Sequence, residues 1–383
     1  MKIDIIAGTR PNYVKIGALF SALKRIKSNH QFRFINTGQH YDAAMAEFFF
    51  KSFSLPKPYF NMNISKKNSN KFSEIFDVYN AFLKKDPPKL CVVVGDVTST
   101  IACALAAKYS NIKIAHIEAG LRSNDFAMPE EINRKITDSI TDIFFTTTIQ
   151  ANQNLINENI KKNVYLVGNV MIDSLKNKLS EIKNLKPQFY LNEYLVITMH
   201  RQANVRNILT LIKFLDAFIN LTKIYDLIYV AHPFVFNKIK NSKEILSKFN
   251  IKKIINKKNY EYLELLSNKD KIKKIKVVSS LSYENFLSLI MKAKGVLTDS
   301  GGLTEETSYL NIPTITFRNN TERPETIKKG TNILIGDDFT KLDNLVKKIK
   351  ANKWKQSTKI PYWDGKSSDR IIKIINQLYD KTS

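Results

Sequence analysis

A dense group of charged residues follows one short apolar run of this sequence. The run, residues 113–115, has the character of a strand that brings Glu118 to its carboxyl end, and Pro129 fits the first turn of a following helix because its φ angle is already helical. The helix dipole favours carboxylates in that turn, and Arg134 falls on the same helix face as Glu130. Carboxylates can move protons and cations can hold anionic groups, so these residue types suit acid/base chemistry. The group comprises three carboxylates, two arginines and a histidine: Glu118, Glu130, Glu131, Arg122, Arg134 and His116.

Polar residues follow other predicted strands of the N-terminal half as well. Any one of them could be a helix cap or half of a surface ion pair, but strand ends are where ligands bind in open α/β sheets. The strand at residues 3–7 leads through a glycine turn into a helix pattern that carries Lys15, an arrangement that can cradle phosphate. Three strand ends are expected to join that of Glu118 at one sheet edge: Arg10 after strand 3–7, His40 after strand 32–36 and Asp96 after strand 90–94.

The C-terminal half repeats this arrangement. Strands at residues 195–198 and 227–230 end at His200 and His232. A further strand, at residues 295–298, runs into a second predicted anion site, where two glycines allow backbone N–H groups to approach a phosphate. A glycine turn needed only for tight packing would look the same. The residues proposed to hold a nucleotide here are Ser300, Gly301, Gly302, Glu306 for the ribose hydroxyls, and Arg323.

Strands and helices alternate along the whole chain, which predicts an α/β protein. A chain of 383 residues exceeds what one core usually supports, so two domains are expected. Residues 1–182 are predicted to form one Rossmann-like domain and residues 190–365 a second, joined by a linker from Lys183 to Tyr190. Residues 366–383 are predicted to form a helix that packs back on the N-terminal domain.

Composition narrows the class of protein. The net charge is +25, but the lysines are spread over helix faces with one cluster from Lys252 to Lys276, so a nucleic-acid-binding module is the less favoured alternative. A membrane segment and a signal peptide are not visible, and a cytoplasmic protein with reduced thiols at Cys91 and Cys103 is expected. The histidines lack metal-ligand spacing and no dinucleotide fingerprint occurs, so neither a metal nor a cofactor is expected.

Eight motifs occur together and in order: GTRP (8–11), TGQH (37–40), GD (95–96), HIEAGLR (116–122), PEEINR (129–134), HR (200–201), DSGG (299–302) and TERP (321–324). This series resembles the non-hydrolysing bacterial UDP-N-acetylglucosamine 2-epimerases. The resemblance implies a GT-B-like pair of Rossmann-type domains whose parallel sheets face a cleft that holds the active site. It also implies a homodimer that interconverts UDP-GlcNAc and UDP-ManNAc without a redox cofactor, for surface polysaccharide precursors.

The resemblance also implies roles for single residues. Asp96, Glu118 and Glu130 take acid/base roles around C2 of the sugar, and His200 joins the catalytic residues. The other positions are expected to contact the diphosphate, to orient the carboxylates or to hold the nucleotide, with Phe286 near the uracil: Arg10, Lys15, His40, Arg134, His232, Phe286, Ser300, Gly301, Gly302, Glu306 and Arg323.

Some positions depart from the family pattern. Many members have glutamate where this chain has Asn12, and many have glutamate in the motif after His-Arg, where Ala203 precedes Asn204 here. These differences leave the sugar open, and a UDP-linked 2,3-diacetamido uronic acid is an alternative substrate. Tyr41 and Asp42 differ from allosterically regulated members, which leaves activation by a second substrate molecule open as well. A GT-B glycosyltransferase, which would share only the nucleotide-binding half, is the remaining alternative.

Overall fold

The structure is a computed structural model that describes residues 1–39, 50–65, 70–185, 193–255, 261–267, 274–279 and 281–380. His40, Tyr41 and Asp42 lie outside the described residues, as does most of the predicted linker. The chain divides into two units. Unit 1 contains residues 1–177 and 360–383, and unit 2 contains residues 178–359. The division falls inside α7 (Val170–Lys183), so one helix continues from the first unit into the second.

Unit 1 is built on a parallel sheet. Within the described residues the sheet has seven strands in the order β3-β2-β1-β4-β5-β6-β7. Six of them follow the 3-2-1-4-5-6 order of the Rossmann fold. All five residues of β4 are buried, as expected for a central strand with both faces covered. The strands are β1 (Lys2–Ala7), β2 (Gln31–Asn36), β3 (Phe60–Asn61), β4 (Leu90–Val94), β5 (Lys113–Ala119), β6 (Ile143–Thr146) and β7 (Val164–Leu166).

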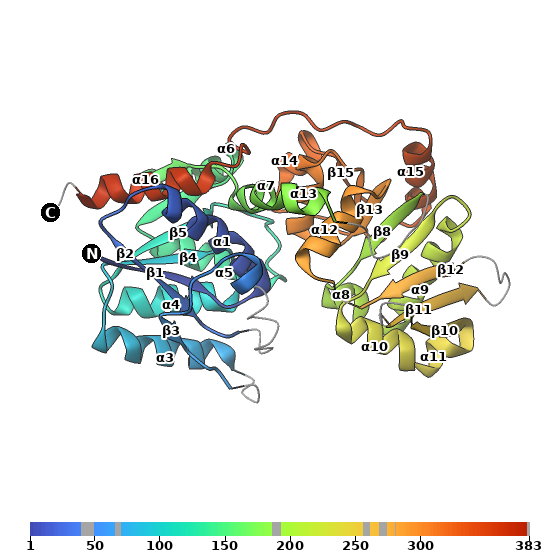
Figure 1. The fold of residues 1–383 in the computed structure, drawn as a ribbon, viewed down its shortest axis with the longest axis horizontal. Helices are drawn as coiled ribbons and strands as arrows, with labels where there is room; N and C mark the ends of the chain where they lie inside the picture. The colour runs from blue at the N-terminus through green and yellow to red at the C-terminus, as the bar shows by residue number, and fades with distance from the viewer. Residues whose placement is uncertain are drawn as a thin grey trace. The chain divides into compact units, whose positions relative to one another are not determined.

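Helices cover this sheet, and the last helix of the chain is one of them. Figure 1 shows α16 in red beside α1, and the two helices pack together. Arg25 at the end of α1 forms a 2.7 Å ion pair with Asp369, and the Ser28 hydroxyl donates to Asn376 over 2.7 Å. The helices of unit 1 besides α7 are α1 (Arg10–Arg25), α3 (Lys71–Lys85), α4 (Thr98–Tyr109), α5 (Pro129–Ile140), α6 (Ile149–Asn157) and α16 (Ser367–Asp380).

Unit 2 repeats the same topology with an added hairpin. Among its described strands the order is β10-β11-β12-β9-β8-β13-β14-β15. The part from β12 to β15 again has the 3-2-1-4-5-6 order of parallel strands, whereas β10 and β11 are antiparallel. The strands are β8 (Tyr194–Thr198), β9 (Asp226–Val230), β10 (Phe249–Ile255), β11 (Glu261–Ser267), β12 (Lys274–Val278), β13 (Gly295–Thr298), β14 (Thr314–Thr316) and β15 (Asn332–Leu334).

A continuous apolar core lies between the unit 2 sheet and its helices. Phe214 and Phe218 of α9 pack on Phe317, and Trp354 closes the same cluster. The helices are α8 (Gln202–Val205), α9 (Ile208–Leu221), α10 (Pro233–Asn241), α11 (Lys243–Lys248), α12 (Tyr283–Met291), α13 (Gly301–Tyr309), α14 (Pro324–Lys328) and α15 (Thr340–Lys350). Among the described residues, no helix combines the length and the apolar character needed to cross a membrane.

Candidate functional site

The carboxyl end of β5 holds Glu118 in an uncommon backbone conformation. Its φ angle is 72°, in the left-handed region that residues other than glycine rarely adopt. The pairing of β5 with β6 shifts register between Ile117 and Ala119, so the strand bulges at this residue. Such a conformation costs on the order of 1 kcal/mol and is concentrated at functional sites. The bulge places the buried Glu118 carboxylate beside Lys15 of α1.

Lys15 holds one oxygen of Glu118. The Lys15 Nζ lies 2.6 Å from Oε2, and the two side chains are 8% and 2% exposed. The second oxygen, Oε1, is buried and has no hydrogen-bond partner among the described residues. Gly95 has a φ angle of 69°, and a Cβ there would lie 3.1 Å from the Lys15 Nζ. Glu118 therefore has one oxygen fixed by a cation and a second oxygen that remains able to accept a hydrogen bond.

The start of α1 is tied to the neighbouring strand by Asn12. Its side-chain amide donates to the Val94 carbonyl over 2.9 Å and its oxygen accepts from the Thr9 hydroxyl at 3.0 Å. A glutamate could not donate to a carbonyl in this way unless it were protonated. Asn12 therefore helps to fix the helix turn that begins at Arg10 and carries Lys15.

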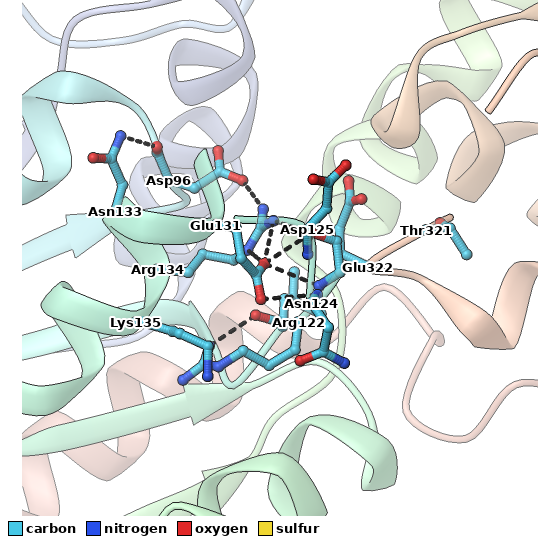
Figure 2. A network of polar contacts seen from close by, with 12 residues as sticks. Asp96, Arg122, Asn124, Asp125, Glu131, Asn133, Arg134, Lys135, Thr321 and Glu322 are labelled. Carbon is cyan, nitrogen blue, oxygen red and sulfur yellow. Dashed lines mark hydrogen bonds and ion pairs between the residues drawn. The ribbon is translucent and has the colours of Figure 1, made fainter. Parts of the chain in front are cut away.

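Arg134 of α5 links two other carboxylates at this sheet edge. Figure 2 shows its guanidinium between Glu131 and Asp96. Its NH2 lies 2.7 Å from Glu131 Oε2, and its NH1 forms an ion pair with Asp96. Asn133 adds a 2.8 Å hydrogen bond to the Asp96 carbonyl. Asp96 is thereby held from two positions on α5, and its side chain remains 25% exposed.

Glu131 is the buried member of the glutamate pair in α5. It accepts hydrogen bonds from the backbone amides of Ser123 at 2.9 Å and Asn124 at 3.0 Å. Burial alone would raise the pKa of Glu131, but the Ser123 amide and Arg134 outweigh burial and hold that pKa below its ordinary value. Glu131 is thus an ionised structural partner that secures the loop between β5 and α5.

Glu130 lies on the exposed side of the same helix turn. Arg134 pairs with Glu131, three residues away, and not with Glu130, because the buried face of α5 contains positions 131, 134, 137 and 138. The carboxylate that Arg134 pairs with on this helix is therefore that of Glu131. The acid/base role of Glu130 stays a prediction.

In unit 2, Asp299 organises the turn that carries His200. Its buried carboxylate accepts hydrogen bonds from the backbone amides of His200 and Arg201, each at 3.0 Å, and from the Asn204 side chain at 3.0 Å. The His200 Nδ1 lies 3.2 Å from the same carboxylate, and the His200 side chain is 50% exposed. Burial would raise the pKa of Asp299, but His200 and Asn204 lower it below its ordinary value.

The glycine pair lies at the start of α13, two residues after Asp299. Ser300 caps this helix by accepting from the Leu303 amide, and Gly302 has open space where a Cβ would be. A Cβ on Gly301 would lie 2.5 Å from a Glu322 oxygen, so a larger residue here would have to displace the Glu322 carboxylate. One turn later, Glu306 accepts from the Tyr283 hydroxyl at 2.6 Å, and burial raises the pKa of Glu306 to about 7.

Arg323 belongs to a buried cluster of charges next to this helix start. Its Nε lies 2.8 Å from Glu305, and its NH1 pairs with Glu322, which also accepts from Arg318 at 2.6 Å. Glu325 is buried with no hydrogen-bond partner for either carboxylate oxygen among the described residues, and burial raises its pKa to about 7. Arg323, which is predicted to contact the ligand, therefore lies in a buried cluster of alternating charges and not in an exposed loop.

Two further predicted contacts are His232 of unit 2 and Phe286 of α12. His232 is exposed and caps α10 by accepting from the Phe234 amide at 3.3 Å. Phe286 of α12 is partly buried against the apolar cluster that includes Val196 and Leu303. The described part of the chain contains no group of three or more histidine, cysteine, aspartate or glutamate side chains arranged to hold a metal ion.

Sequence reasoning did not assign several residues of these clusters. Asp299 lies in the DSGG motif and Asn12 directly follows GTRP, but Val94, which Asn12 contacts, and His200, which Asp299 contacts, lie far away in the chain. The burial of Glu131 is decided by the packing of α5, whose buried face contains Glu131 and Arg134. Nothing in the sequence indicated that Tyr283 and Glu325 belong to these clusters.

Two Rossmann-type sheets, each with a charged cluster at its strand ends, define a two-domain α/β enzyme. A family model described as UDP-N-acetylglucosamine 2-epimerase matches residues 22–376. Together with relatives that are 38% identical over their whole length, this match shows that the chain belongs to the UDP-N-acetylglucosamine 2-epimerase family, whose members are isomerases.

The relatives match along their full length. The UDP-N-acetylglucosamine 2-epimerase of Methanocaldococcus jannaschii is 38% identical, with 98% of this chain and 99% of that protein covered. The UDP-2,3-diacetamido-2,3-dideoxy-D-glucuronate 2-epimerase of Pseudomonas aeruginosa is 29% identical, with coverage of 99% and 100%. A crystal structure of the M. jannaschii enzyme in complex with UDP-GlcNAc and UDP superposes with a TM-score of 0.85 at 34% identity, covering 98% of this chain and 100% of that one. These likenesses confirm the predicted fold class, two parallel-sheet α/β domains of GT-B type.

Proposed function

We propose that this protein interconverts UDP-GlcNAc and UDP-ManNAc by eliminating UDP and adding it back. The observation that carries the proposal is the state of Glu118. Its carboxylate is buried, one oxygen is held by Lys15, and the other has no partner among the described residues. A carboxylate kept in this way suits proton transfer at a carbon that is only weakly acidic.

The proposed reaction is balanced without a redox step. A base takes the proton from C2 while the bond from C1 to the diphosphate oxygen breaks, and the electron pair leaves with UDP. The product is a 2-acetamidoglucal with a double bond between C1 and C2. A proton then returns to the opposite face of C2, and UDP re-forms the bond to C1. Cations around the departing diphosphate would stabilise its developing charge, and Lys15 and Arg10 are proposed for this role.

Asp96, Glu118 and Glu130 are proposed as the acid/base groups, with His200 as a further catalytic group. Arg134 holds Asp96 in place, and this contact supports a role of Asp96 near the sugar. Unit 2 is proposed to hold UDP, since the N-terminus of α13 lacks side chains at two positions and can offer backbone N–H groups to a diphosphate. The residues proposed to bind the nucleotide or substrate are His40, His232, Phe286, Ser300, Gly301, Gly302, Glu306 and Arg323.

Two relatives are named for different sugars, and their sequence identities to this chain favour one of the two substrates. The M. jannaschii relative, named for UDP-N-acetylglucosamine, is 38% identical, whereas the P. aeruginosa relative, named for the diacetamido glucuronate, is 29% identical. UDP-GlcNAc is therefore the proposed substrate and the diacetamido uronate the second candidate. A homodimer and a role in supplying activated sugars for surface polysaccharide complete the proposal.

Incubation with UDP-GlcNAc in D₂O, followed by NMR, tests this function. The expected result is UDP-ManNAc with deuterium at C2 in both epimers. Free ManNAc together with UDP would mean a hydrolysing enzyme, and transfer of the sugar to an added acceptor would mean a glycosyltransferase. Turnover of the UDP-diacetamido uronate alone would move the proposal to that sugar. As a matched control, the Glu118→Gln variant should bind UDP with wild-type affinity and incorporate no deuterium.

A further inference from the structure

His116 is fully buried two residues before Glu118, and the proposed reaction does not use it. Both of its ring nitrogens have partners. The Nδ1 lies 2.7 Å from Asp138 Oδ1, and the Nε2 lies 2.9 Å from the carbonyl oxygen of Gly95. These are short contacts to two different segments, since Asp138 belongs to α5 and Gly95 follows β4.

The two partners of the His116 ring determine which of its nitrogens carry hydrogen. The Gly95 carbonyl can only accept a hydrogen bond. Burial would raise the pKa of Asp138, but His116 and Arg122 outweigh burial and lower it, so this residue is an ionised carboxylate and also only accepts. Arg122 NH1 lies 2.7 Å from its second oxygen. Because each nitrogen faces an acceptor, both must carry hydrogen, and His116 is an imidazolium between Asp138 and Gly95.

The same network secures the backbone on both sides of Glu118. His116 donates to the Gly95 carbonyl, and the Gly120 amide donates to Asp138 Oδ2 over 3.0 Å. Gly95, Glu118 and Gly120 all have left-handed φ angles, of 69°, 72° and 77°. Glycine adopts such angles at little cost, but the left-handed Glu118 persists only when contacts around it fix the backbone. His116 and Asp138 supply these contacts.

We propose that the buried His116 imidazolium and Asp138 are positioning residues for proton transfer at C2. They hold the Gly95 and Gly120 turns and thereby set the places of Asp96 and Glu118. Neither residue touches the substrate. The inference rests on the proposed function, because it assigns the purpose of the network to that reaction.

The two-proton ring can be tested without any substrate. Histidine ¹⁵N NMR of the uniformly labelled protein separates a ring with two N–H groups from either neutral tautomer. The chain has five histidines, so loss of one signal set in His116→Gln assigns the resonance. Because both ring nitrogens of His116 face acceptors, we expect the spectrum to show two protonated nitrogens on this residue. A single protonated nitrogen there would overturn the inference.

The positioning role can be tested with two variants that each keep one of the two hydrogen bonds. His116→Gln places an amide donor where Nε2 meets Gly95, whereas His116→Asn places one where Nδ1 meets Asp138. Both variants remove the positive charge of His116. If His116 contributes only to stability, the two variants should therefore change the rate equally. A misplaced catalytic group costs on the order of 10²-fold in rate. We expect deuterium incorporation at C2 to slow about 10²-fold in the asparagine variant and no more than about 10-fold in the glutamine variant, with little change in KM.

The rates of deuterium incorporation in both variants are compared with that of wild type at a temperature far below their unfolding temperatures. The comparison requires that the variants bind UDP with wild-type affinity. Equal rates in the two variants, or rates that follow thermal stability, would overturn the positioning role. A wild-type protein that leaves UDP-GlcNAc unchanged would instead contradict the proposed function. In that case only the NMR result tests the network. Two protonated nitrogens on His116 would support its proposed hold on the Gly95 and Gly120 turns, and a single protonated nitrogen would reject it.

Discussion

The buried carboxyl of Glu306 is expected to make unit 2 less stable as the pH rises from about 5 to about 7. Burial raises the pKa of this group to about 7, against the effect of the 2.6 Å hydrogen bond from Tyr283. The ordinary value, which applies to the unfolded chain, is 4.5. Between these two values the folded protein holds a proton that the unfolded chain has released, so raising the pH favours unfolding.

The magnitude follows from the same two values. From 4.5 to about 7 is about 2.5 pH units, and each unit corresponds to about 1.4 kcal/mol, so the loss of stability approaches about 3 kcal/mol. The Glu306→Gln variant has no group that titrates here and retains an oxygen that can accept from Tyr283. The free energy of unfolding of the variant, measured relative to wild type, should therefore rise by about 3 kcal/mol between about pH 5 and about pH 8.

The two tryptophans allow unit 2 to be followed separately. Trp354 packs in the unit 2 core, whereas Trp363 belongs to unit 1. In a Trp363→Phe background, fluorescence during urea unfolding therefore reports unit 2, and the Glu306→Gln comparison is made in that background. Glu131→Gln in unit 1 is the control and should leave this signal unchanged. A difference between variant and wild type that stays constant over the pH range would refute the assignment of a raised pKa to Glu306.

Three further experiments have defined outcomes. Lys15→Met and Glu118→Gln should each destabilise unit 1 by about 3 kcal/mol in urea unfolding, and the double variant should lose less than their sum; additive losses would show that the pair is not coupled. Asp299→Ala leaves buried amides without an acceptor and should lower the free energy of unfolding by about 2 kcal/mol, while His200→Ala, with its side chain half exposed, should change it little; equal effects would contradict the assigned hydrogen bonds. Deletion of residues 367–380 should unfold unit 1 and preserve unit 2 in limited proteolysis, and an intact unit 1 would show that α16 is dispensable.

Most elements of the fold could be predicted from hydrophobic patterning. The strands at Leu90–Val94 and Gly295–Thr298 have the predicted bounds. The hairpin of β10 and β11 was not predicted, because it lies in the lysine-rich stretch and its apolar residues alternate only partly. Its antiparallel pairing depends on which residues of the two strands face each other, and the tertiary structure decides this register. Lysines on such an edge strand also discourage pairing with other chains.

The candidate site could be predicted as a set of residue types at strand ends, but not as a set of contacts. Glu130 and Glu131 both lie in the first turn of α5, and only the packing of that helix decides that Glu131 is buried. The left-handed backbone of Glu118 likewise comes from a bulge against β6, which the sequence of β5 alone does not reveal. Pairings such as Lys15 with Glu118 depend on strand order, because their positions lie 103 residues apart.

The placement of α16 has a consequence for the order of events during synthesis on the ribosome. Unit 2 is encoded between two parts of unit 1, and the last part, α16, buries Ile371, Ile372 and Ile375. The backbone amides at the start of α16 also satisfy the buried Asp173 carboxylate. Unit 1, whose first residues are made before those of unit 2, can therefore complete its fold only after α16 has left the ribosome. Until then the nascent protein exposes the surface of α1 that α16 will cover, and a chain that stops before α16 leaves unit 1 incomplete although most of its residues have been made.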